Sequence, residues 1–177
     1  MHRCIGLILC VLATWVSAQA QPNWQGILFG ATAEQIAASP LKPEKLAKRE
    51  VSPHGRQYVD YRLKNYEIAR HQFAVSFFMG TTSDKLEEVS LATTKLTPVD
   101  GEVLCDSISQ TLSGKYSRPV AASDKGDRLS RTVNKRWRGD GVSVQLACLI
   151  FTLPDSQSAY VMINYLPLTG SGDASKL

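Results

Sequence analysis

The sequence has little of what nucleic-acid-binding and metal-dependent proteins need. Its 20 basic residues stand against 16 acidic ones, and so mild an excess gives no reason to expect a nucleic-acid partner. Of its three histidines, His54 and His71 lie outside the leader described below. Neither has a Cys, His or carboxylate at metal-ligand spacing, and a closed zinc site needs four such ligands. We therefore expect no nucleic acid, no metal and no cofactor.

The sequence also has no recognisable nucleophile motif. Gly-x-Ser-x-Gly does not occur, and Ser107, Ser109 and Ser113 follow a helical pattern instead of lying on a sharp turn. Adjacent acids such as Glu87 and Glu88 point to opposite faces of a strand and do not form a catalytic pair. A triad assembled from distant residues leaves no trace in a sequence. A small periplasmic hydrolase with dispersed catalytic residues therefore remains the alternative to a non-enzymatic protein.

The first twenty residues have the order of a cleavable secretory signal. Arg3 precedes an apolar run over residues 4–16, and the small residues Ala18 and Ala20 favour cleavage before Gln21. The run is shorter than the roughly 20 apolar residues that span a bilayer. Leu9, before Cys10, is too large for a lipid-attachment site. We expect a periplasmic or secreted protein with no stable membrane anchor.

Without this leader, residues 1–20, the chain is predicted to form one domain and a short tail. Loss of Arg3 leaves 19 basic and 16 acidic residues, a net charge of +3. The length of residues 21–168 suits a single domain. The Gly-Ser-Gly sequence at 170–172 predicts a flexible tail over residues 169–177. The sequence leaves the oligomeric state open.

Two of the four cysteines remain after the leader is removed, and in an oxidising compartment an even number favours a disulfide. Cys105 lies beside an apolar helical stripe, and Cys148 lies in a strand that is apolar on both faces. A helix packed on a sheet would bring the two together. We predict a Cys105–Cys148 disulfide; the alternative is two buried free thiols.

The hydrophobic pattern predicts two helices and six strands. One helix begins at Thr32, which forms a capping box with Gln35, and ends near Ser39. The other begins at Thr97 and is capped by Gly114. Residues 41–56 are predicted to form a loop. Strands are expected at residues 58–63, 72–79, 85–94, 132–138, 142–151 and 159–166. The expected fold is α+β, an antiparallel sheet of about six strands with two helices packed on one face.

A basic segment is the candidate binding patch. Basic side chains beside an aromatic ring can hold an anionic partner through charge-assisted hydrogen bonds and cation–π contacts. The alternative is an exposed edge strand that charge protects against aggregation, with the Trp packed on the sheet. The residues concerned are Arg128, Arg131, Lys135, Arg136, Trp137 and Arg138.

The first helix start resembles a motif of small bacterial envelope modules, Gly-x-Thr-x-x-Gln-(Val/Ile). These modules include the accessory lipoproteins of outer-membrane barrel assembly and the β-lactamase inhibitory proteins. The resemblance rests on Gly30-Ala31-Thr32-Ala33-Glu34-Gln35-Ile36. It implies helices on an antiparallel sheet and a binding role without catalysis. The leading hypothesis is a periplasmic or secreted non-enzymatic binding module whose partner is an envelope protein or an exported hydrolase.

Overall fold

The computed structural model describes residues 21–153 and 156–168. The predicted signal at residues 1–20 and the predicted flexible tail at 169–177 lie outside the described residues.

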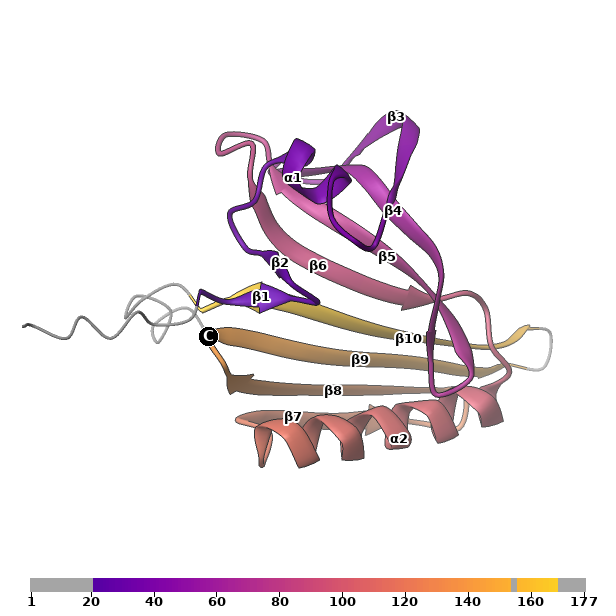
Figure 1. Cartoon of the computed structure of the whole chain (residues 1–177). Helices are drawn as coiled ribbons and strands as arrows, with labels where there is room; N and C mark the ends of the chain where they lie inside the picture. Colours follow the sequence, from indigo (N-terminus) through magenta and orange to yellow (C-terminus); the bar gives the residue numbers. More distant parts are fainter. Residues whose placement is uncertain (1–20, 154–155, 169–177) are drawn as a thin grey trace, which may run out of the picture.

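Eight antiparallel strands form one sheet, in the order β3-β4-β5-β6-β10-β9-β8-β7 (Figure 1). The strands are β3 (Glu44–Val51), β4 (Gln57–Ile68), β5 (His71–Gly80), β6 (Leu86–Thr93), β7 (Ala121–Gly126), β8 (Ser130–Gly139), β9 (Val142–Leu153) and β10 (Ser156–Pro167). A second, two-stranded sheet pairs β1 (Asn23–Trp24) with β2 (Ile27–Leu28). The helices are α1 (Ala33–Ala37) and α2 (Pro98–Tyr116).

The eight-stranded sheet is built from two halves of the same topology. In each half one helix is followed by four strands that pair in sequence order, α1 with β3–β6 and α2 with β7–β10. The halves meet in the middle of the sheet, where β6 pairs with β10 and Leu91 lies opposite Ile163. The edge strands β3 and β7 are therefore the first strand of each half.

The predicted sheet of about six strands with two helices on one face is wrong. The predicted loop at residues 41–56 contains β3, and β7 follows α2 as a further strand. Both strands were missed because their side chains are mostly exposed, so their sequences show no hydrophobic alternation. They pair with their neighbours through backbone hydrogen bonds alone. Only α2 packs along the sheet, on β8, β9 and β10, whereas α1 is a five-residue helix against β4.

Both helix starts form as the sequence predicts. The Thr32 side chain accepts from the Gln35 backbone, and the Gln35 side chain accepts from the Thr32 backbone. Thr97 caps α2 by accepting from the Asp100 amide at 3.1 Å. The predicted end at Gly114 is wrong, because α2 continues to Tyr116. The Tyr116 ring packs on Gly139, where a side chain would collide with it.

One core lies on one face of the sheet, beneath α2 over the second half and beneath Trp24, Ile27 and Ile36 of β1, β2 and α1 over the first. Alternate residues of every central strand are buried there, among them Phe77, Leu91, Leu146 and Ile163. Cys105 of α2 and Cys148 of β9 belong to this core and lie at disulfide distance, with their Cα atoms 6.2 Å apart. The predicted pairing of the two cysteines is confirmed. The bond joins the helix layer to the sheet within the second half of the chain.

Candidate binding face

The face of the sheet opposite α2 carries a row of polar residues across six strands. Leu91, Ile163 and Leu146 point into the core, so their neighbours in sequence point to the opposite face. We call this opposite side the open face. The strand register places each member of the row directly beside the next. In sheet order the polar row is Arg62, Ser76, Ser90, Asn164, Gln145 and Arg136.

Hydrogen bonds connect the row where strands from the two halves meet. The hydroxyl of Ser90 in β6 donates to the side-chain oxygen of Asn164 in β10 at 2.8 Å. Ser90 is 8% exposed, so this bond satisfies a polar group that would otherwise be buried without a partner. Farther along the row, Arg62 Nε donates to the Ser76 hydroxyl at 3.1 Å. The row is therefore part of the sheet's own polar packing.

The two arginines at the ends of the row have different surroundings. Arg62 donates to both carboxylate oxygens of Glu50, at 3.2 and 2.7 Å. Arg136 lies opposite Ala121 of the edge strand β7. Its Nε is buried and has no hydrogen-bond partner in the described part of the chain. One end of the row is thus neutralised by the protein itself, and the other has an unused donor.

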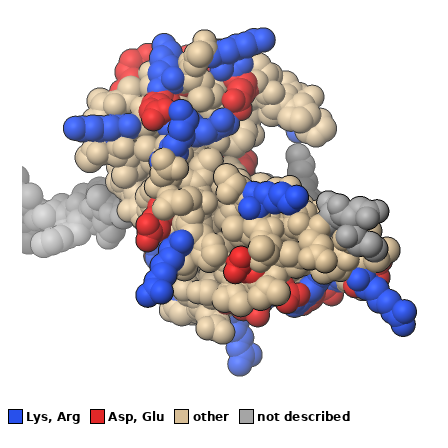
Figure 2. All heavy atoms as spheres, turned by 90° about the vertical axis from the view of Figure 1, so that its right-hand side faces the viewer, with Lys and Arg blue, Asp and Glu red and all other residues tan. Residues whose placement is uncertain are grey.

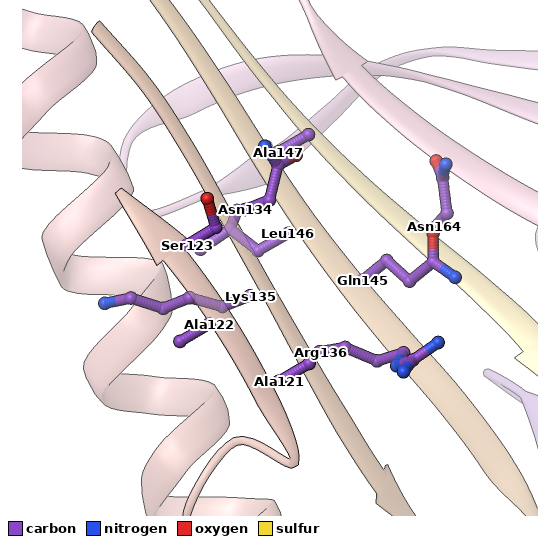
Figure 3. A pocket seen from close by; sticks show the side chains of 10 residues that line it. All are labelled: Ala121, Ala122, Ser123, Asn134, Lys135, Arg136, Gln145, Leu146, Ala147 and Asn164. Carbon is purple, nitrogen blue, oxygen red and sulfur yellow. The ribbon is translucent and has the colours of Figure 1, made fainter. Parts of the chain in front are cut away.

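A hollow of about 390 Å³ lies over β7, β8, β9 and β10 beside this second arginine. Figure 3 shows Arg136 extending across β9 on the side of Gln145, with Asn164 beyond, whereas Lys135 points away toward α2. Small side chains on the neighbouring strands leave the space open. The lining residues are Ala121, Ala122, Ser123, Asn134, Lys135, Arg136, Gln145, Leu146, Ala147 and Asn164.

The predicted basic patch is divided between the two faces of the sheet. Lys135 donates to the Ser109 hydroxyl of α2 at 2.7 Å, and the fully buried Trp137 donates from its indole N–H to Ser113 at 3.3 Å. Arg131 binds Asp124 at 2.7 Å and Glu102 of α2 at 3.6 Å. These three side chains therefore belong to the packing of α2 on the sheet.

The remaining patch residues do not form one surface either. Arg136 lines the hollow, and Arg138, two residues along the same strand, shares its face. Arg128 lies in the β7–β8 turn, where its carbonyl oxygen accepts from the Thr152 hydroxyl at 2.9 Å. Sequence reasoning missed Gln145 and Asn164. The signal that could have found them is an amide side chain within an otherwise apolar strand, because such a residue points to the open side of a sheet.

The side chains with a shifted pKa do not line the hollow. Burial raises the pKa of Tyr165 to about 12, where its ring packs in the core against Trp24. Burial also raises the pKa of the Glu88 carboxyl, which lies on the open face of β6 beside Phe78. On the α2 side, the hydrogen bonds from Arg131 lower the pKa of Asp124. None of these three side chains lines the hollow.

No group of three or more His, Cys, Asp or Glu side chains in residues 21–153 and 156–168 is placed to hold a metal ion. In the same residues, no helix has the length and apolar character needed to cross a membrane.

Comparison of the chain with protein-family models, with curated proteins and with solved structures gave no match.

Proposed function

We propose that the protein is a non-enzymatic binding module of the cell envelope that binds a protein partner on the open face of its sheet. The observation that carries this proposal is the polar row, which crosses six strands on the face that α2 leaves uncovered. The row ends beside a hollow with an unused donor on Arg136. At this end of the row the exposed Gln145 and the unused donor of Arg136 can form hydrogen bonds to a partner.

The chemistry of the row supports recognition over catalysis. Asn164 and Gln145 supply amide groups, which donate and accept hydrogen bonds without changing charge near neutral pH. A guanidinium such as that of Arg136 carries hydrogen-bond donors and no acceptor, so it offers no general base. Side chains of this kind fix the orientation and identity of a partner. The hydrolase alternative would require a base and a nucleophile that converge on the same hollow.

Export is the second part of this proposal. The order of basic, apolar and small residues before Gln21 is typical of a cleavable signal. The Cys105–Cys148 pair supports an oxidising compartment, since disulfides persist there and are rare in the cytosol. We therefore expect the protein from a periplasmic or secreted fraction to begin at about residue 21. Recovery of the intact Met1 form in the cytosol alone would contradict export.

Site-specific cross-linking tests the binding face. A photoreactive residue replaces Gln145, which is exposed on the open face, or Val103, which is 64% exposed on α2. The first variant should give one discrete adduct with an envelope protein of the source cell, and the second should give none. Adducts from position 103 alone, or from neither position, would contradict a binding role for the open face. Turnover of ester or peptide substrates that is lost on replacement of Gln145 would favour the hydrolase.

A further inference from the structure

The two halves of the sheet carry arginines at corresponding places. Arg62 lies in β4 and Arg136 in β8, each in the second strand of its half. Both belong to the polar row, one at each end. The strand outside each of them is the edge strand of the sheet, β3 for Arg62 and β7 for Arg136. The first half therefore shows how an arginine at this place is satisfied in this fold.

In the first half, the edge strand supplies a carboxylate. Glu50 of β3 binds the Arg62 guanidinium through two hydrogen bonds, of 3.2 and 2.7 Å. Two parallel bonds of this kind match the planar fork of a guanidinium to the two oxygens of a carboxylate. A second glutamate of the same strand, Glu44, binds Lys64 at 2.6 Å. Edge strand β3 thus neutralises both cations that β4 presents beside it.

In the second half, the edge strand supplies no such group. Ala121 lies opposite Arg136, and the next residues of β7 on the same face are Ser123 and Lys125. Strands β7 to β10 contain a single acidic residue, Asp124, and Arg131 binds it on the α2 side. The unused Nε of Arg136 is therefore a buried donor, which costs free energy until an acceptor reaches it.

We propose that the hollow beside Arg136 binds a carboxylate group of the ligand, which takes the place that the Glu50 carboxylate takes against Arg62. This inference rests on the proposed function and names the chemistry of its site. The methyl side chains of Ala121 and Ala147 leave the space, and the amides of Gln145 and Asn164 line it beside the guanidinium. Their N–H groups donate to the carboxylate oxygens that Arg136 does not reach.

Side-chain NMR of the ¹⁵N-labelled domain tests the inference directly. The Arg136 Nε–H signal and the side-chain amide signals of Gln145 and Asn164 should shift on titration with acetate or glutarate, and saturate at roughly millimolar to tens of millimolar concentration, as a single ion pair allows. The Arg62 Nε–H signal should stay in place, because Glu50 occupies that guanidinium. Absence of any shift at Arg136, or an equal shift with sulfate and phosphate, would overturn a carboxylate site.

Two further probes identify the source of the carboxylate. A capped single glutamate is compared with a capped heptapeptide that has one central glutamate and otherwise alanine and serine. At least tenfold tighter binding of the peptide would assign the site to an acidic side chain of a polypeptide. Equal binding would assign it to small organic acids. A cross-link from position 145 without any carboxylate binding would leave the binding face in place and overturn this inference alone.

A built-in competitor completes the test. Ala121→Glu places a carboxylate opposite Arg136 on the strand that lacks one. This variant should move the Arg136 Nε–H signal toward its ligand-bound position and weaken binding of the carboxylate probes at least tenfold. Ala121→Gln, which occupies the same space without the charge, should weaken binding of these probes at least threefold less than Ala121→Glu. Equal loss in both variants, or no loss in either, would show that no carboxylate binds against Arg136.

Discussion

The two halves of the sheet share a topology and differ in charge. Strands β3–β6 contain six acidic and five basic residues, whereas β7–β10 contain one acidic and five basic residues. In the first half, Arg62 forms an ion pair with Glu50, and Arg49 forms one with Asp60. Figure 2 shows Lys and Arg side chains close to Asp and Glu side chains in the upper part of the molecule, where β3 and β4 lie. In the second half, Arg136 keeps an unused donor.

The halves also differ in how firmly their helix is held. In the first half the five-residue α1 contributes one buried side chain, Ile36, to the core. In the second half the nineteen-residue α2 packs along three strands and is linked to β9 through Cys105 and Cys148. The half with the hollow is thus the more constrained one. A rigid support holds binding groups in place and lowers the entropy lost on association.

The largest expected effect comes from Trp137, which the sequence pattern placed in the binding patch. Trp137→Ala should lower the free energy of unfolding by about 4 kcal/mol, because the side chain is fully buried and its indole N–H binds Ser113. The neighbouring Arg138→Ala should change it by less than about 0.5 kcal/mol. Urea unfolding followed by fluorescence and circular dichroism measures both. A Trp137 variant as stable as the parent would place that ring outside the core.

Replacement of both cysteines should remove the difference in constraint between the halves. Cys105→Ala with Cys148→Ala should lower stability by about 2–4 kcal/mol, since the 43-residue separation is no longer closed in the unfolded chain. Hydrogen exchange should rise mainly in α2, β8 and β9, with little change in β4 and β5. Uniform acceleration across both halves would show that the bond acts on the whole sheet. Mass spectrometry of the unreduced parent protein without residues 1–20 should find no free thiol.

The two arginines at the ends of the row give a matched comparison. Arg62→Ala removes the bonds to Glu50 and Ser76 and should cost about 0.5–1 kcal/mol. Arg136→Ala removes a donor that has no partner, so it should leave stability within about 0.5 kcal/mol or raise it. Thermal unfolding of both variants in one buffer makes the comparison. If Arg136→Ala were the more destabilising change, its guanidinium would already be satisfied within the fold.

The smallest effect concerns a carboxyl on the open face of the first half. Burial raises the pKa of Glu88 in the folded protein, so folding favours its protonated form. Its contribution to stability is therefore present below the ordinary glutamate pKa and is lost as the pH rises through the folded pKa. Glu88→Gln should gain stability relative to the parent between pH 4 and pH 7, by less than about 1 kcal/mol, because the carboxyl is partly exposed. A constant difference across this pH range would contradict the shift.

The sequence predicts those parts of the fold that rest on burial or on local hydrogen bonds. Thr32 and Thr97 mark helix starts because their capping partners lie three residues away. The cysteine pairing follows from the apolar surroundings of both residues. Strands β3 and β7 escaped detection because an exposed edge strand needs only backbone partners. Hydrophobic alternation in a sequence indicates that one face of a strand is buried. It therefore reveals a paired strand only when that strand also has a buried face.

The candidate site was predictable only in part, since it depends on strand order. Arg136 was singled out, but the pattern grouped it with Lys135 and Trp137, which point to the other face. Ser90 and Asn164 are 74 residues apart in the chain and meet because β6 pairs with β10. No local signal reports that pairing. A row that runs across strands is therefore invisible until the sheet order is known.

The arrangement of the polar row also sets which changes of length the chain tolerates. Each member comes from a different strand, and a one-residue insertion ahead of it within its strand would turn it toward the core. The hairpin turns, by contrast, lie at the ends of the strands and can lengthen without moving the row. Related sequences should therefore vary in turn length, while within each strand the alternation of the row member with core-facing residues is kept.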